Sequence, residues 1–167
     1  MKKNIVLFLI LGIAFPICIS AGRDKAKVLY VIDGDTLKIS YHGRKESIRL
    51  IGIDAPETRK NRKAYKDSKR SNNDINAITS QGRLAKKYVN SLVNKGAIVA
   101  IQFDIEKRDR YRRLLGYVYL PDGRMLNDLI IRNGYASPLT ISPNIKYKNR
   151  FLRSYRYARK HSLGLWK

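Results

Sequence analysis

The sequence predicts an α+β protein whose main feature is a five-stranded β-barrel, accompanied by about three α-helices. Five short apolar runs with the period-two alternation of half-buried strands are spread along the chain. The helical patterns come late, after the third strand and toward the C-terminus. With 167 residues, of which 44% are hydrophobic and 29% charged, the chain has the size and composition of one domain with a hydrophobic core.

The first three strands are predicted at residues 25–32, 36–41 and 45–51. They form a meander, because the sequence HGR at 42–44 is a typical turn and Ile48 and Leu50 share one face of the third strand. The apolar run VLYVIDGDTLKI at 28–39 is interrupted by two acids around a glycine. This interruption indicates a turn or a functional site.

Residues 58–78 are polar and strongly basic and show neither helical nor strand periodicity, which predicts a long loop. A helix is predicted at about 80–94, where Leu84, Tyr88 and Leu92 recur every four residues. The remaining elements are two strands at 97–103 and 114–120 and two helices at about 125–133 and 145–160. Five strands with helices inserted late are typical of a small Greek-key barrel of the OB type, a fold that often binds nucleic acids.

The charge of the chain is strongly unbalanced. It contains 35 Lys and Arg residues against 13 Asp and Glu, a formal net charge of +22. Such an excess exceeds what solubility requires and indicates a polyanionic partner. The alternative is a generally cationic surface, as found on some secreted basic proteins.

The N-terminus has the three-part pattern of a secretory signal, with a two-lysine start, an apolar run at 5–19 and small residues after it. We therefore predict a cleaved signal peptide at 1–20, cut after Ser20 or Ala21, and a single domain at 21–167. The mature protein is then secreted or periplasmic and has no stable association with a membrane. Its oligomeric state is expected to be a monomer.

Two alternatives remain for this N-terminal segment. A lipoprotein would carry its lipid on Cys18, and an uncleaved anchor would stay in the membrane, although the apolar run is shorter than the ~20 residues of a bilayer span. Cys18 is the only cysteine of the chain. Signal cleavage thus leaves a protein without disulfides or cysteine-based metal sites.

Carboxylates and arginines are the side chains that remain for chemistry. The sequence after residue 20 contains no cysteine and two isolated histidines, which excludes histidine-rich metal sites and cysteine nucleophiles. Asp33 and Asp35 flank a glycine, and the segment RLIGIDAPE supplies Arg49, Asp54 and Glu57. Hard oxygen ligands of this kind suit Ca²⁺ or Mg²⁺.

Residue spacing by itself does not decide whether these groups form a site. In strict strand alternation Arg49 and Asp54 face opposite sides, so a bend, expected at Gly52, must bring them together. The structural alternative is an Asx-type turn at 33–35 and a strand end capped by Asp54. Both interpretations stay open at this level.

Five segments together resemble the successive motifs of the staphylococcal-nuclease (thermonuclease-like) family, in order and at compatible spacing. They are IDGDT at 32–36, RLIGIDAPET at 49–58, DRYRR at 109–113, NDLIIRNGYA at 127–136 and GLW at 164–166. They extend over nearly the whole chain after residue 20. The resemblance implies an OB-fold barrel that hydrolyses DNA and RNA with Ca²⁺ and low sequence specificity, leaving 3′-phosphate ends.

The same resemblance implies a metal site. Asp35 and Asp54 would ligate Ca²⁺ by their carboxylates, with the backbone carbonyl of Ala55 as a further ligand. Gly34 would let the backbone turn between the two acids, and Asp33 would serve the turn rather than the metal. The strand is then interrupted because a metal ion sits beside it.

The resemblance also implies three catalytic residues. Glu57 would act as general base or orient the attacking water. Arg49 and Arg113 would bind the phosphate, since planar guanidinium groups match its oxygens and offset the charge of the transition state.

The chain departs from the family pattern at three places. Arg112 stands where the archetype has a glycine before the second phosphate-binding arginine, so either of two adjacent arginines could fill that role, and the register favours Arg113. Tyr111 matches the tyrosine of this motif and is expected near a terminal phosphate. The segment YASPLTISPN at 135–144 lacks the archetype's pair of base-flanking tyrosines, and the basic segment 58–78 is longer than the archetype's loop.

The sequence therefore predicts a Ca²⁺-dependent nuclease acting on DNA and RNA. One alternative is a nucleic-acid-binding module on the same fold that has lost its chemistry, but every expected active-site position is filled here. Another is a cationic membrane-active protein, which would need an amphipathic basic helix, and the predicted helix at 145–160 fits that pattern only loosely.

Overall fold

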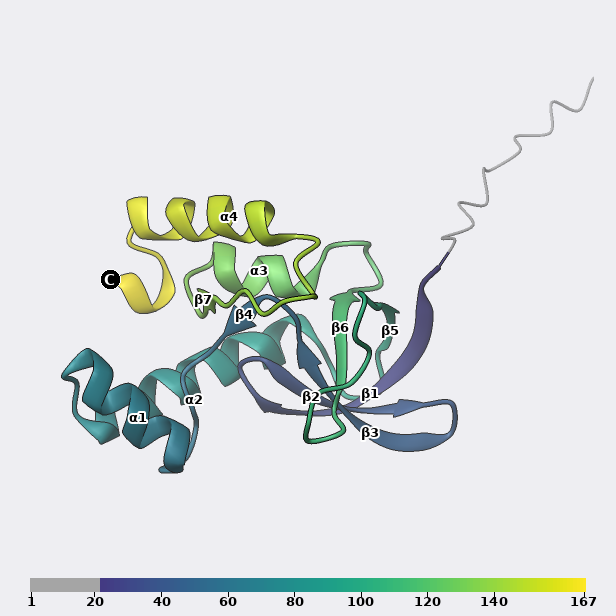
Figure 1. Cartoon of the computed structure of the whole chain (residues 1–167), viewed down its shortest axis with the longest axis horizontal. Helices are drawn as coiled ribbons and strands as arrows, with labels where there is room; N and C mark the ends of the chain where they lie inside the picture. Colours follow the sequence, from purple (N-terminus) through teal and green to yellow (C-terminus); the bar gives the residue numbers. More distant parts are fainter. Residues whose placement is uncertain (1–21) are drawn as a thin grey trace, which may run out of the picture.

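Five strands close into a barrel in the computed structural model, which describes residues 22–167 (Figure 1). The barrel order is β1-β2-β3-β6-β5. Neighbouring strands pair antiparallel except β3 and β6, which pair parallel. The bounds are β1 Asp24–Asp33, β2 Thr36–Tyr41, β3 Arg44–Leu50, β5 Ile98–Gln102 and β6 Leu114–Tyr119. This closed barrel confirms the predicted fold class.

The barrel interior is filled by the apolar positions of the predicted alternation. Ile48 and Leu50 of β3 are both buried, as their shared face predicts, and they pack with residues of the other strands. Full burial of each such side chain contributes about 1.5–3 kcal/mol to stability. The fully buried barrel residues include Val28, Leu37, Ile39, Ile101 and Val118.

Within residues 22–167 four α-helices accompany the barrel, where about three were expected. α2 packs against β1, α3 packs against β6, and α4 lies beside α3, whereas α1 packs on α2 and projects away from the barrel (Figure 1). The bounds are α1 Arg62–Ser71, α2 Ile75–Leu92, α3 Leu126–Arg132, α4 Lys148–Lys160 and a short 3₁₀ helix η1 at Gly164–Trp166.

The prediction of a long loop at 58–78 is wrong, because α1 and the start of α2 occupy most of it. α1 has one buried residue, Ala64, so it lacks the apolar stripe by which helices are identified. The helix is capped at its start: the side chain of Asn61 accepts a hydrogen bond from Ala64 N at 2.9 Å. Asp74 caps α2 in the same way, accepting from Asn76 N at 2.7 Å.

Two short strands, which the sequence analysis did not predict, pair with each other outside the barrel. β4 (Ile53–Asp54) pairs antiparallel with β7 (Ser137–Pro138), with Asp54 opposite Ser137. Two-residue strands are too short to show any periodicity.

Some predictions lie outside the described residues. These are the signal peptide at 1–20 and the fate of Cys18. Within residues 22–167 the structure contains no helix that is long and apolar enough to cross a membrane.

Candidate functional site

The turn between β1 and β2 carries the first site residue. Asp33 and Thr36 are paired at the end of the two strands, and Gly34 and Asp35 form the turn between them. Asp35 N donates a hydrogen bond to Asp33 Oδ1 at 3.2 Å, which is the turn role expected for Asp33. Burial and the nearby Asp35 carboxylate raise the pKa of Asp33 to about 7.

Gly34 is required for a different reason than expected. Its φ lies outside the left-handed region, so the turn itself does not require a glycine. A Cβ at this position would lie 2.6 Å from the Cβ of Ala55 and 2.9 Å from the Cβ of Ala85. The glycine therefore lets the turn approach α2 and the segment after β4, which places Asp35 next to Ala55.

Asp35 is a buried carboxylate with 6% exposure. Its Oδ2 accepts a hydrogen bond from Ala55 N at 2.8 Å, and its Oδ1 accepts one from the Thr36 hydroxyl at 3.0 Å. Arg49, which lies opposite Thr36 in the β2–β3 register, forms an ion pair with Oδ2. Burial by itself would raise the pKa of Asp35, but the Arg49 guanidinium and the hydrogen bonds outweigh it and hold the pKa below its ordinary value.

The bend expected at Gly52 brings Asp54 to the same place. Gly52 has a φ of +81° in the turn that follows β3. Arg49 Nη2 then donates to Asp54 Oδ1 at 3.0 Å, so one guanidinium bridges Asp35 and Asp54. The structure thus brings together Arg49 and Asp54, which strict alternation would have separated, and places Asp35 beside them.

A lysine that the sequence analysis missed lies in the middle of these groups. Lys63 of α1 is surrounded by oxygen atoms. Its Nζ is 3.2 Å from the carbonyl oxygen of Ala55, 3.4 Å from Asp54 Oδ1, 3.3 Å from Glu57 Oε1 and 3.1 Å from Asp67 Oδ2. Burial would lower the pKa of Lys63, but Asp54 and the neighbouring carboxylates outweigh it and raise the pKa.

Glu57 lies at the edge of the same cluster. Its Oε2 accepts a hydrogen bond from Asn61 Nδ2 at 2.8 Å, and its Oε1 faces Lys63. Asn61 therefore has two roles, since it also caps α1. The carboxylate of Glu57 is held in place while its position remains partly open to solvent.

The expected metal ligands fit a hard cation. Within residues 22–167 no three His, Cys, Asp or Glu side chains form a cluster that could hold a metal ion. The expected ligands are not a cluster of this kind, because they are two carboxylates, those of Asp35 and Asp54, and the backbone carbonyl of Ala55. The Lys63 ammonium lies against Asp54 and this carbonyl, so these oxygens are already arranged around a positive charge.

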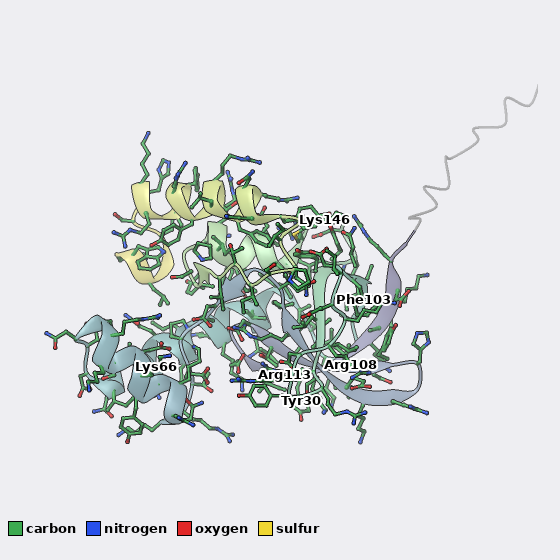
Figure 2. The ribbon with its side chains drawn as sticks, viewed as in Figure 1. Tyr30, Lys66, Phe103, Arg108, Arg113 and Lys146 are labelled. Atoms are coloured by element: carbon green, nitrogen blue, oxygen red, sulfur yellow. The ribbon has the colours of Figure 1, made fainter. Side chains whose placement is uncertain are left out.

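Arg113 is held by an aspartate that the sequence analysis did not assign. Asp109 accepts from Arg113 N at 3.0 Å and from Arg113 Nε at 2.7 Å, and Arg113 Nη2 is also 2.7 Å from Asp109 Oδ2. Arg112 instead has a φ of +63°, the left-handed conformation for which glycine is the relaxed residue. Figure 2 shows Arg113 between Arg108 and α1, which is marked by Lys66.

Arg49 and Arg113 line one cavity of about 730 Å³, which we call the arginine cavity. Among the described residues, those that line this cavity include Arg113 but not Arg112. Arg113 is therefore the better candidate for binding the phosphate. Tyr111 also lines this cavity and is 65% exposed. The segment at 135–144 contributes Leu139 and Ile141. Aliphatic side chains thus replace the tyrosine pair whose absence the sequence indicated.

Residues 47–167 match the family model described as staphylococcal nuclease homologue. The chain belongs to this family. It is 33% identical over 137 residues to endonuclease YncB of Bacillus subtilis, covering 81% of this chain and 58% of that protein. It is 30% identical over 148 residues to the thermonuclease of Staphylococcus hyicus, covering 88% of this chain and 78% of the relative.

Two further relatives show the same pattern. The chain is 35% identical over 137 residues to the thermonuclease of Staphylococcus intermedius, covering 81% of this chain and 72% of the relative. It is 32% identical over 137 residues to the SPbeta prophage-derived endonuclease YokF of Bacillus subtilis, covering 81% of this chain and 41% of that protein. The chain therefore spans about half the length of the two Bacillus relatives.

Proposed function

We propose that this protein is a Ca²⁺-dependent nuclease that hydrolyses phosphodiester bonds of DNA and RNA with low sequence specificity and leaves 3′-phosphate ends. The observation that carries the proposal is the Arg49 guanidinium that bridges Asp35 and Asp54, next to Glu57 and at the edge of the arginine cavity. Relatives named endonuclease and thermonuclease support the same class of reaction.

In this proposal Asp35, Asp54 and the carbonyl of Ala55 hold the calcium ion. When bound, the ion supplies positive charge next to the phosphate. Lys63 contacts two of these three groups, so its ammonium would compete with the ion for their oxygens.

The remaining residues act directly on the substrate. Arg49 and Arg113 donate hydrogen bonds to the phosphate oxygens and offset the negative charge that grows on them in the transition state. Glu57 accepts a proton from the attacking water or fixes its direction. Asp109 keeps the Arg113 guanidinium oriented toward the cavity, so it is a positioning residue.

The export of the protein belongs to the same proposal. The signal pattern at 1–20 supports a secreted or periplasmic monomer without stable membrane association, and the net charge of +22 supports a nucleic-acid substrate.

Release of acid-soluble nucleotides from DNA and from RNA tests the function. We expect release with Ca²⁺, none with EDTA, and recovery when Ca²⁺ is restored. The control variant Asp122→Asn removes a carboxylate from an exposed turn and should cleave like the unmodified protein. DNA binding without any release would instead identify a catalytically inactive nucleic-acid-binding module.

A further inference from the structure

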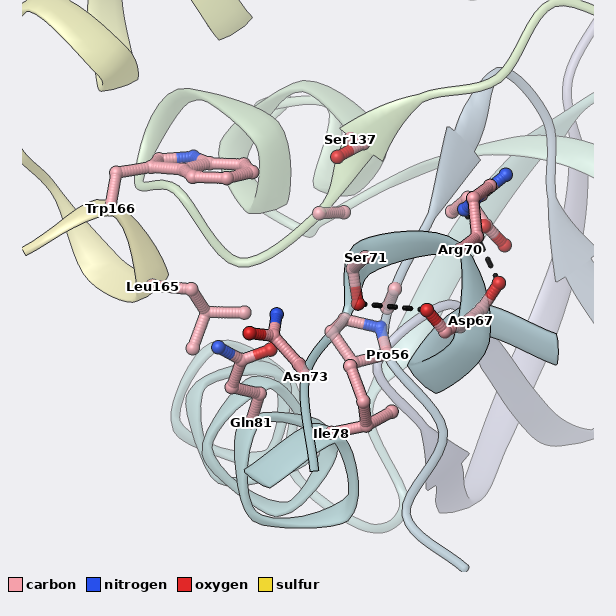
Figure 3. A pocket seen from close by; sticks show the side chains of 13 residues that line it. Pro56, Asp67, Arg70, Ser71, Asn73, Ile78, Gln81, Ser137, Leu165 and Trp166 are labelled. Carbon is pink, nitrogen blue, oxygen red and sulfur yellow. Dashed lines mark hydrogen bonds and ion pairs between the residues drawn. The ribbon is translucent and has the colours of Figure 1, made fainter. Parts of the chain in front are cut away.

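A second cavity lies beside the candidate site and, among the described residues, shares no lining residue with the arginine cavity. It measures about 220 Å³ and is bounded by α1, α2, β7 and η1. Asp54, Ala55 and Pro56 line it, so it begins at the residues proposed to hold the calcium ion. Figure 3 shows Trp166 and Leu165 on one side of this space and Gln81, Asn73 and Ile78 on another. We call it the tryptophan cavity.

We propose that the tryptophan cavity binds a nucleobase of the substrate, on the side of the cleaved phosphate opposite to the arginine cavity. The inference rests on the proposed function, because it assumes that the phosphodiester binds at Arg49, beside the calcium ligand Asp54.

The lining of the cavity has the chemistry of a base-binding pocket. Trp166, Leu165 and Ile78 supply apolar surface for the faces of a flat ring. Gln81 and Asn73 supply amide groups that can donate to and accept from the edge of a base. Each base carries both kinds of group, so a pocket of this composition tolerates different sequences.

Trp166 packs against two neighbouring side chains. Its ring lies edge-on to Tyr155 at a centroid distance of 5.5 Å, and the Arg159 guanidinium lies 4.8 Å from the ring centroid. Its buried Nε1 has no hydrogen-bond partner among the described residues. Because this nitrogen is buried, Trp166 contributes the apolar carbons of its ring to the cavity.

The charges around the cavity favour a neutral ring over an anion. Asp54 and Asp67 both line it, and their carboxylates would repel a free phosphate or a carboxylate ligand. A nucleobase is uncharged, while the phosphate attached to it would lie outside, toward Arg49. Arg70 also lines the cavity and is paired with Asp67.

The position of the two cavities agrees with the shape of a dinucleotide. Arg49 lines the arginine cavity, Asp54 lines the tryptophan cavity, and the two side chains are joined at 3.0 Å. A phosphodiester bound at Arg49 has one nucleoside on each side. Each nucleoside then has a cavity next to it.

Fluorescence of Trp166 tests the inference, because it is the only tryptophan of the chain. The measurement uses the Glu57→Gln variant, so that cleavage is slow, and Ca²⁺ is present. The probe is the dinucleotide thymidylyl-deoxyadenosine, and the reference ligand is thymidine 3′,5′-bisphosphate, which has one base. We expect a saturable fluorescence change with the dinucleotide and none when the bisphosphate occupies the arginine cavity.

Variants of the polar edge give a second measurement. Gln81→Ala combined with Asn73→Ala should weaken dinucleotide binding about five- to tenfold, as expected for the loss of contacts to one base, and leave bisphosphate binding unchanged. The control Ser80→Ala changes the exposed neighbour of Gln81 and should alter neither.

The outcomes separate this inference from the proposed function. Calorimetric binding of the dinucleotide without a fluorescence change, or with the same affinity in the double variant, would overturn the base-binding cavity while the nuclease assignment stands. Absence of dinucleotide binding, together with absence of DNA cleavage by the unmodified protein, would overturn the proposed function and this inference with it.

Discussion

Lys63 is a residue of the candidate site that the sequence analysis did not predict. Its ammonium contacts Asp54 and the carbonyl of Ala55, two of the three groups proposed to bind calcium. It also contacts the carboxylates of Glu57 and Asp67. A cation of the chain itself would therefore compete with the proposed calcium ion for the same oxygens.

Replacement of Lys63 by methionine should strengthen Ca²⁺ binding. We expect a gain of roughly tenfold in affinity, or about 1.4 kcal/mol, because the competing charge is removed from a site that solvent screens in part. Calorimetric titration with Ca²⁺ measures this. Lys66→Met, which removes an exposed lysine from the next part of α1, is the matched control. Unchanged or weaker Ca²⁺ binding in Lys63→Met would show that Lys63 does not compete with the ion.

Asp109 provides a second test at the scale of one residue. Asp109→Asn should leave Arg113 with a weaker and less directional partner, since three of its nitrogen atoms now contact this carboxylate. We expect kcat/KM for DNA to fall roughly ten- to hundredfold through misplacement of the guanidinium. Ca²⁺ affinity should remain unchanged, because among the described residues the Asp109 side chain contacts Tyr111 and Arg113 and none of the proposed ligands. A normal kcat/KM would mean that Arg113 needs no such support.

The secondary-structure elements differ in how much their sequences reveal. The barrel strands were predictable, because one face of each strand is buried and alternation records this directly. α1 was missed because it buries only Ala64, and its capping residue Asn61 was the one available signal. Asp35, Arg49 and Asp54 could be predicted from their motifs. Lys63 could not, since only the fold of α1 brings it to them.

The cations of α1 and the segment before it allow a test at this scale. Seven basic residues occur between 58 and 78, and two of them, Lys63 and Arg70, form ion pairs. Within the described part of the chain, the other five are exposed and form no ion pair. They are Arg59, Lys60, Arg62, Lys66 and Lys69.

Replacement of Lys60, Arg62, Lys66 and Lys69 by glutamine keeps good helix formers and removes four charges. If these residues contact the substrate backbone, DNA binding should weaken at low salt. The slope of log K against log salt should also fall by about 0.9 for each lost contact with duplex and about 0.7 with single strands. Cleavage of a dinucleotide, too short to reach them, should stay nearly constant. An unchanged slope would exclude contact between α1 and nucleic acid.

At the scale of the whole molecule, the net charge of +22 is the basis for expecting a nucleic-acid substrate. The N-terminal pattern is the basis for expecting export. We expect the intact mass of the exported protein to lack residues 1–20, including Cys18. Mass spectrometry of the culture medium or the periplasmic fraction measures this directly. A protein that begins at Cys18 and carries lipid would contradict the prediction, as would a full-length chain retained in the membrane.

The most direct test of the central claim is to separate turnover from metal binding in two variants of the proposed site. Glu57→Gln should lower kcat on DNA by about 10²–10⁴-fold, the usual contribution of a general base, with nearly normal Ca²⁺ affinity. Asp35→Asn should instead weaken Ca²⁺ binding itself, because it removes the charge of a buried ligand. Near-normal cleavage and Ca²⁺ affinity in both variants would contradict the account, since neither residue would then have the role that its position in this cluster implies.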